Sequence, residues 1–179
     1  MNTIIVEGGK DMGNRIYPIG IQNFEKIRKE GYVYVDKTAL MYKLVKSGSY
    51  YFLSRPRRFG KSLLISTLEA YFEAKRDLFE GLAVETLEKD WVKRPVFHLD
   101  LNIGKYDTPD SLDKILNETL DYWESLYGTR SAETTLALRF AGVVGRAYEQ
   151  SGERVAILID EYDKPLLQAI GNEELQREF

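Results

Sequence analysis

The tripeptide Gly-Lys-Ser at residues 60–62 constrains this chain most, because of what surrounds it. It is preceded by Tyr50–Leu53, an aromatic and aliphatic run with the composition of a short buried strand. The residues between the two contain Pro56 and cannot form regular secondary structure. From residue 61 to about residue 79, apolar residues recur at helical spacing. The sequence therefore predicts a strand, an irregular loop and a helix in immediate succession.

The remaining patterns alternate between strands and helices. A second strand is expected at Pro95–Leu101, where apolar and polar residues alternate, and Tyr32–Val35 is also rich in β-formers. A third is expected at Arg154–Ile159, an apolar run typical of a strand buried on both faces of a parallel sheet. The other expected helices are residues 23–29, 37–46, 109–127 and 132–150 and a last stretch from Pro165, interrupted near Gly171. This order predicts an α/β protein with a mostly parallel sheet flanked by helices.

Composition narrows the chemistry. The chain has 179 residues, the size of one domain, with 25 basic and 28 acidic side chains and a net charge of −3. That balance does not fit a protein that coats nucleic acid or an anionic membrane. With no cysteine and one histidine, His98, the chain lacks the residues for a disulfide, a thiolate metal site or a multi-histidine zinc site. No secretory signal and no apolar run of bilayer length is present, so we expect a soluble, cytoplasmic protein.

The start of the helix at Lys61 has the chemistry of a phosphate-binding loop. Gly60 lets the backbone approach an oxyanion closely, and the amides of residues 60–63 are unpaired at the helix start. Lys61 supplies a positive charge for the β- and γ-phosphates of a nucleotide, and the Ser62 hydroxyl is a suitable ligand for Mg²⁺. Alternatively, the tripeptide is simply where a helix begins.

The loop departs from the pattern G-x-x-x-x-G-K-[ST] at its start. Arg55 stands at the first glycine position, and Pro56 lacks an amide donor. Arg55, Arg57 and Arg58 add positive charge, which either contacts phosphate or an acidic neighbour, or stays solvated. The candidate nucleotide-binding residues are Arg57, Arg58, Phe59, Gly60, Lys61, Ser62 and Leu63.

Two carboxylates follow the third strand. Asp160 ends the apolar run, which is the usual place for an acid that holds Mg²⁺ beside a phosphate loop, directly or through water. Glu161 is then placed to polarise an attacking water as a general base. The plainer alternative is a buried strand that ends in surface acids. Asp163 is more simply interpreted as the cap of the helix at Pro165, and the sequence leaves open whether Asp36–Thr38 borders the nucleotide.

Four segments act as signatures: Tyr17–Gly20, Tyr34–Thr38, Ser54–Ser62 and Leu158–Pro165. Together they resemble the bacterial and archaeal AAA-ATPase-like domain family, in which the string Arg-Pro-Arg-Arg-Phe-Gly-Lys-Ser is characteristic. The resemblance covers residue 17 to the end and leaves residues 1–16 as a leader. It implies a P-loop NTPase core with ATP as the nucleotide. Family members are typically longer, and many carry a C-terminal nuclease-like domain of the PD-(D/E)XK type.

The same resemblance implies further core strands, a polar sensor residue and an arginine finger beyond Asp160, where this chain ends about one helix later. We therefore expect a truncated P-loop domain with uncovered sheet edges, through which copies of the chain associate. The expected function is ATP binding with Mg²⁺-dependent hydrolysis, with Lys61 and Glu161 in catalytic roles and Ser62 and Asp160 holding the metal. Two alternatives stay open. One is a nucleotide-dependent binding or regulatory module without hydrolysis, and the other is a nucleic-acid-processing factor that uses the arginine-rich loop, which the net charge of −3 opposes.

Overall fold

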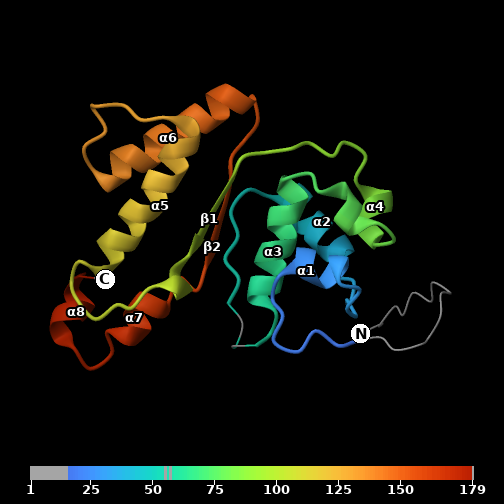
Figure 1. Ribbon diagram of the computed structural model, residues 1–179, viewed down its shortest axis with the longest axis horizontal. Helices are drawn as coiled ribbons and strands as arrows, with labels where there is room; N and C mark the ends of the chain where they lie inside the picture. The colour runs from blue at the N-terminus through green and yellow to red at the C-terminus, as the bar shows by residue number, and fades with distance from the viewer. Residues whose placement is uncertain (1–15, 55, 57, 179) are drawn as a thin grey trace.

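The computed structural model describes residues 16–54, 56 and 58–178. In chain order its elements are α1 (Phe24–Lys29), α2 (Thr38–Ser47), α3 (Lys61–Phe72), η1 (Arg76–Phe79), α4 (Ala83–Leu87), β1 (Val96–Asp100), η2 (Leu101–Ile103), α5 (Ser111–Tyr127), α6 (Leu136–Ser151), β2 (Ala156–Asp160), α7 (Lys164–Gln168) and α8 (Glu173–Glu178). Helices α1 to α4 lie on one side of the two strands, and α5 and α6 lie on the other (Figure 1).

The sheet consists of β1 and β2, which pair in parallel. The register places Val96 opposite Ala156 and Asp100 opposite Asp160, so both strands end in an aspartate at the same edge of the sheet. Helices α5 and α6 form the crossover between the strands, as a parallel pair requires. The predicted α/β class is thus confirmed, with a sheet of two strands among the described residues. The finer prediction of a P-loop fold remains a prediction.

The larger core lies between α3 and the other helices on its side of the sheet. Asn23 caps α1 by accepting a hydrogen bond from the Lys26 amide at 2.8 Å, and this directs Phe24 inward, where it is fully buried. The Phe24 ring packs against Phe79 at 4.9 Å between centroids. Leu158 of β2 belongs to the same cluster. This core therefore fixes α1, α3 and β2 relative to one another.

The smaller core covers the opposite face of the sheet. Phe97 of β1 is fully buried and stacks on Trp123 of α5, with ring centroids 4.5 Å apart and an interplanar angle of 11°. Val143 and Ala147 of α6 complete the cluster. Alternate residues of β1 thus serve the two cores, because Val96 packs on the α3 side and Phe97 on the α5 side.

The prediction of a buried strand at Tyr50–Leu53 is wrong. The structure has no strand there, and none of the four side chains is buried. Their exposed fractions range from 96 % at Tyr50 to 38 % at Leu53. A strand needs a hydrogen-bonded neighbour, and within the described residues no strand pairs with this run. Instead, the Phe52 ring contacts Tyr162 just past β2, at 5.1 Å between centroids. Tyr32–Val35 forms no strand either.

Strand β2 is less buried than its composition indicated. Ile157 and Ile159 are 43 % and 48 % exposed, although a strand buried on both faces was predicted. The reason is that β2 has β1 on one side only within the described residues. The prediction of an uncovered sheet edge agrees with this arrangement, while association of copies through that edge remains untested.

Several helix boundaries also differ from the predicted ones. Helix α3 ends at Phe72 rather than near residue 79, because Ala74 takes a left-handed conformation with φ of 56° before η1 begins. Helix α6 begins at Leu136, where the Thr135 side chain accepts a hydrogen bond from the Leu138 amide. Over the part of the chain that the structure describes, none of the helices has the length and apolar character needed to cross a membrane.

Candidate functional site

The first backbone amides of α3 have no side-chain cap. Gly60 is the cap residue, with φ of 76° and ψ of 27°, a left-handed conformation that favours glycine. Because glycine has no side chain, it cannot accept a hydrogen bond from these amides as a capping serine or aspartate would. Arg58 is also left-handed, with φ of 66°. Arg55 and Arg57 lie outside the described residues.

The other predicted residues of this corner differ in their surroundings. The ammonium group of Lys61 has no ion pair or hydrogen bond within the described residues. Phe59 is 63 % exposed and packs in neither core. Leu63 packs its side chain against the larger core, so only its backbone amide remains for an anion. Within the described residues, the corner therefore combines uncapped amides with the positive charges of Arg58 and Lys61, for which no ion pair is found.

Two acidic residues, Asp160 and Glu161, stand at the end of β2 and differ in their surroundings. Asp160 is only 7 % exposed, and its Oδ1 accepts a hydrogen bond from the Glu161 amide at 2.9 Å. Within the described residues no hydrogen bond reaches its Oδ2. Glu161 has φ of 51°, a conformation rarely adopted by residues with a side chain. This turn directs the chain away from the strand and into α7.

A hollow of about 280 Å³ joins the start of α3 to the ends of both strands. Its lining residues are Gln22, Asn23, Ser62, Ser66, Glu69, His98, Asp100, Asn102, Asp160 and Glu161. The structure thus brings Ser62, Asp160 and Glu161 together, as predicted from the sequence. Residues 58–61 and Leu63 are not among the lining residues. The described lining residues include four carboxylates and no lysine or arginine, which favours cations in the hollow.

Sequence reasoning did not identify the lining residues of this hollow that follow Ser62 on α3. Ser62, Ser66 and Glu69 follow one another at helical spacing and line one face of α3, a signal that was available from the sequence. The Glu69 carboxylate lies 3.3 Å from Nδ1 of His98 on β1. This contact raises the pKa of His98, although burial opposes the shift. His98 is therefore a half-buried strand histidine that ties α3 to the sheet.

The described residues contain no cluster of three or more histidine, cysteine, aspartate or glutamate side chains that could hold a metal ion. An all-protein metal cage is therefore absent from this part of the chain. Mg²⁺ in nucleotide sites is usually held differently, by one or two protein oxygens together with phosphates and water. The Ser62 hydroxyl and the free Oδ2 of Asp160 fit that smaller donor set.

Asp36–Thr38, left open by the sequence, serves the structure elsewhere. The Asp36 carboxylate accepts hydrogen bonds from the Thr38 amide at 2.8 Å and the Ala83 amide at 2.7 Å. Thr38 is fully buried. These contacts tie α2 to α4, and none of the three residues lines the hollow beside Ser62. Asp163 occupies the cap position of α7 but makes no side-chain cap hydrogen bond.

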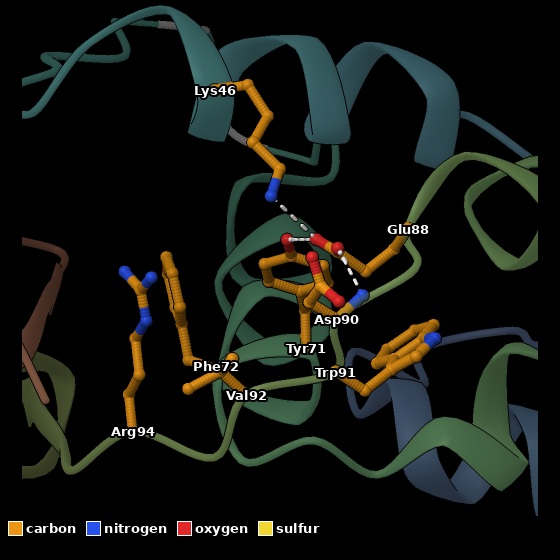
Figure 2. A pocket seen from close by; sticks show the side chains of 8 residues that line it. All are labelled: Lys46, Tyr71, Phe72, Glu88, Asp90, Trp91, Val92 and Arg94. Atoms are coloured by element: carbon orange, nitrogen blue, oxygen red, sulfur yellow. Dashed lines mark hydrogen bonds and ion pairs between the residues drawn. The ribbon is translucent and has the colours of Figure 1, made fainter.

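A second hollow, of about 240 Å³, lies between α2, the end of α3 and residues 88–94. Figure 2 shows Lys46 reaching toward the Glu88 carboxylate, to which the Tyr71 hydroxyl also points. The Lys46 ammonium is 3.0 Å from Glu88 Oε2, and Tyr71 donates a hydrogen bond to the same oxygen. Arg94 lies over the Phe72 ring. Because the Glu88 carboxylate is already satisfied, we interpret this hollow as a structural junction.

Replacing Glu88 by glutamine should lower the free energy of unfolding by about 2 kcal/mol at neutral pH, the usual value of charged hydrogen bonds. Burial alone would raise the pKa of Glu88, but hydrogen bonds from Tyr71, Lys46 and the Asp90 amide outweigh it and lower that pKa. A carboxyl with a lowered folded-state pKa stabilises the protein above its ordinary pKa of 4.5 and loses that effect as the pH falls toward the folded-state value.

Urea unfolding across the acid range measures this effect. The difference between wild type and Glu88→Gln should shrink below about pH 4. Glu80→Gln is the matched control, because Glu80 is exposed and its side chain makes no hydrogen bond or ion pair within the described residues. A difference that stays constant down to about pH 2 would show that the charge of Glu88 is not what stabilises the junction.

The structure thus defines an α/β protein in which the start of a helix and the acidic ends of two strands share one polar hollow. The family model described as predicted AAA-ATPase matches residues 18–179, and the chain belongs to this AAA-ATPase-like family. The resemblance inferred from the four signature segments is confirmed. Membership of the family supports nucleotide binding as the general function.

A curated relative from Azotobacter chroococcum mcd 1, named an uncharacterized protein in the vnfD 5′ region, is 40 % identical over 170 residues. The match covers 94 % of this chain and 33 % of the relative, so the chain spans about a third of that protein's length. No solved structure matches the chain.

Proposed function

We propose that this chain is the ATP-binding part of a Mg²⁺-dependent ATPase, and that hydrolysis drives a conformational change in a longer protein. The observation that carries the proposal is the shared hollow, in which Ser62 at the start of α3 faces Asp160 and Glu161 at the end of β2. Membership of a family of predicted AAA-ATPases supports the same reading.

The polyphosphate binds at the start of α3. The left-handed Gly60 keeps side-chain atoms away from the anion, and the uncapped amides of residues 60–63 donate to its oxygens with the favourable end of the helix dipole behind them. Lys61 adds a charge that has no competing partner within the described residues. Arg57, Arg58 and Phe59 approach the same ligand from the loop.

Ser62 and Asp160 would hold Mg²⁺, which would supply positive charge against the phosphates. Asp160 suits this role because it is buried and its Oδ1 is fixed by the Glu161 amide, which leaves Oδ2 for the metal or its water. Glu161 lines the hollow beside Asp160 and takes the proton of the attacking water. The two neighbouring acids thus have separate tasks.

A nucleotide-binding module without hydrolysis is the second candidate. The observation that favours it is that, among the described residues, no arginine or lysine lines the hollow. An arginine that stabilises the transition state of phosphoryl transfer contributes a factor of about 10³ to 10⁵ in rate in related chemistry. Without such a group, the chain alone would hydrolyse ATP slowly even with Glu161 in place.

Two measurements test the proposal together: titration calorimetry with Mg²⁺-ATP and the rate of phosphate release. Binding with phosphate release supports the ATPase, binding without release supports the second candidate, and no binding contradicts both.

Asp160→Asn should weaken ATP binding in the presence of Mg²⁺ by about tenfold, as expected for the loss of one charged ligand. Binding measured in EDTA should be unchanged, because the substitution affects the nucleotide through the metal. Asp90→Asn is the matched control, since Asp90 is exposed and lines the other hollow. Equal Mg²⁺ dependence in wild type and Asp160→Asn would exclude Asp160 as a metal ligand.

A further inference from the structure

A lysine at the start of α7 is hydrogen-bonded to η2, the short helix that follows β1. Lys164, the first residue of α7, donates hydrogen bonds through Nζ to the main-chain oxygen of Asn102 and, at 3.1 Å, to its side-chain Oδ1. The Lys164 amide also donates to the Glu161 carbonyl at 3.0 Å, which closes the turn that carries Glu161. The clamp therefore joins the Glu161 turn to η2.

The hydrogen bonds from Lys164 fix the orientation of the Asn102 side-chain amide. A lysine ammonium is a donor only, so the carboxamide atom that faces it must be the oxygen. The Nδ2 group is then the free end, and it has no hydrogen-bond partner within the described residues. The Asn102 backbone is fixed as well, because its amide donates to Asp100 Oδ1 at 2.8 Å.

Asn102 lines the same hollow as Ser62, Asp160 and Glu161. The strand ends contribute three carboxylates to that lining, Asp100, Asp160 and Glu161, which accept hydrogen bonds and repel an anion. At this edge Asn102 is a neutral side chain with two free N–H donors. An anionic group that entered the hollow would therefore meet a donor from the β1 side at Asn102.

We propose that Asn102 is a further substrate-contacting residue, whose side-chain amide donates to the terminal phosphate of the bound nucleotide, and that Lys164 is the positioning residue that orients it. The inference rests on the proposed function, because it takes the phosphates to lie between α3 and the strand ends. It adds a contact from η2, directly after β1, that neither the phosphate loop nor the acids at the end of β2 supply.

Asn102→Asp provides the sharpest test, because aspartate keeps the shape and the contact with Lys164 but replaces the donors with an acceptor. We expect the affinity for a non-hydrolysable ATP analogue to fall by about tenfold or more, and the affinity for ADP to change little. Calorimetry with Mg²⁺ gives both affinities without relying on turnover. Thermal unfolding without nucleotide should match wild type.

Lys164→Met tests the positioning role. This variant should lose less affinity for the ATP analogue than Asn102→Asp does, and its affinity for ADP should be retained. Lys164→Arg should keep most of the wild-type affinity for the analogue, because arginine is also a pure donor. Lys105→Met is the matched control, since Lys105 is an exposed lysine nearby whose side chain makes no hydrogen bond or ion pair within the described residues.

The outcomes separate the two proposals. If wild type binds neither nucleotide, the proposed function fails, and this inference fails with it. If wild type binds both and Asn102→Asp binds both equally well, the function stands and the role of Asn102 is wrong. A loss of both nucleotides to the same extent also overturns the inference, because the contact would not be to the terminal phosphate.

Discussion

Replacing Lys61 by alanine is expected to weaken the binding of Mg²⁺-ATP by about a hundredfold or more. Lys61 directly follows the left-handed cap of α3, and its ammonium has no partner within the described residues. A charge-assisted hydrogen bond is worth about 1.5 to 3 kcal/mol, and a lysine in this position can make two of them to the phosphates. Among the described residues, those that line the adjoining hollow include no lysine or arginine that could replace the lost charge there.

Calorimetry measures the loss, and thermal unfolding checks that the fold is unchanged. Lys93→Ala is the matched control, because Lys93 is exposed and its side chain has no ion pair or hydrogen bond within the described residues. Lys61→Arg should retain part of the affinity, since the charge is kept while its shape changes. If Lys61→Ala binds ATP as well as wild type, the start of α3 is an ordinary helix start and the nucleotide proposal fails.

Elements with a local cause could be predicted from the sequence. Helix α1 was predicted over residues 23–29, and it begins where Asn23 caps it, with Phe24 and Ile27 buried three residues apart. The ends of strands β1 and β2 differ from the predicted ends by one or two residues. In these cases the decisive interactions lie within a few residues along the chain, so the pattern contains the information that folding uses.

Elements that depend on a distant neighbour could not be predicted in the same way. Tyr50–Leu53 has the composition of a strand, but composition does not say whether another strand lies beside it, and among the described residues none pairs with it. The same limit explains Ile157 and Ile159, whose exposure depends on what covers the free edge of β2. Strand propensity describes a fit to a sheet and cannot supply the sheet itself.

The candidate site divides along the same line. Ser62, Asp160 and Glu161 were predicted because each stands at a fixed place in a local motif. The contact between Glu69 and His98 was missed, because it depends on how α3 packs against β1, which the sequence pattern does not show. Asp100 was missed because its position opposite Asp160 depends on the register of two strands that are 60 residues apart in sequence. Such residues become visible only once the strands are paired.

Glu161→Gln is expected to retain ATP binding and to reduce phosphate release by about a hundredfold or more, the usual contribution of a general base. Glutamine keeps the size of the side chain and its place in the hollow but cannot take a proton from water. The measurement is single-turnover phosphate release at saturating Mg²⁺-ATP, with affinity determined separately by calorimetry. Release at the wild-type rate would exclude Glu161 as the base.

The backbone of Glu161 offers a second variant that separates chemistry from folding. Its φ of 51° costs a residue with a side chain about 1 kcal/mol, whereas glycine adopts this conformation freely. Glu161→Gly should therefore unfold at the wild-type temperature or above and still lose phosphate release. If both variants lose release while only the glycine variant gains stability, the left-handed turn places a catalytic carboxylate at the expense of stability. A glycine variant that is markedly less stable would instead assign Glu161 a structural role.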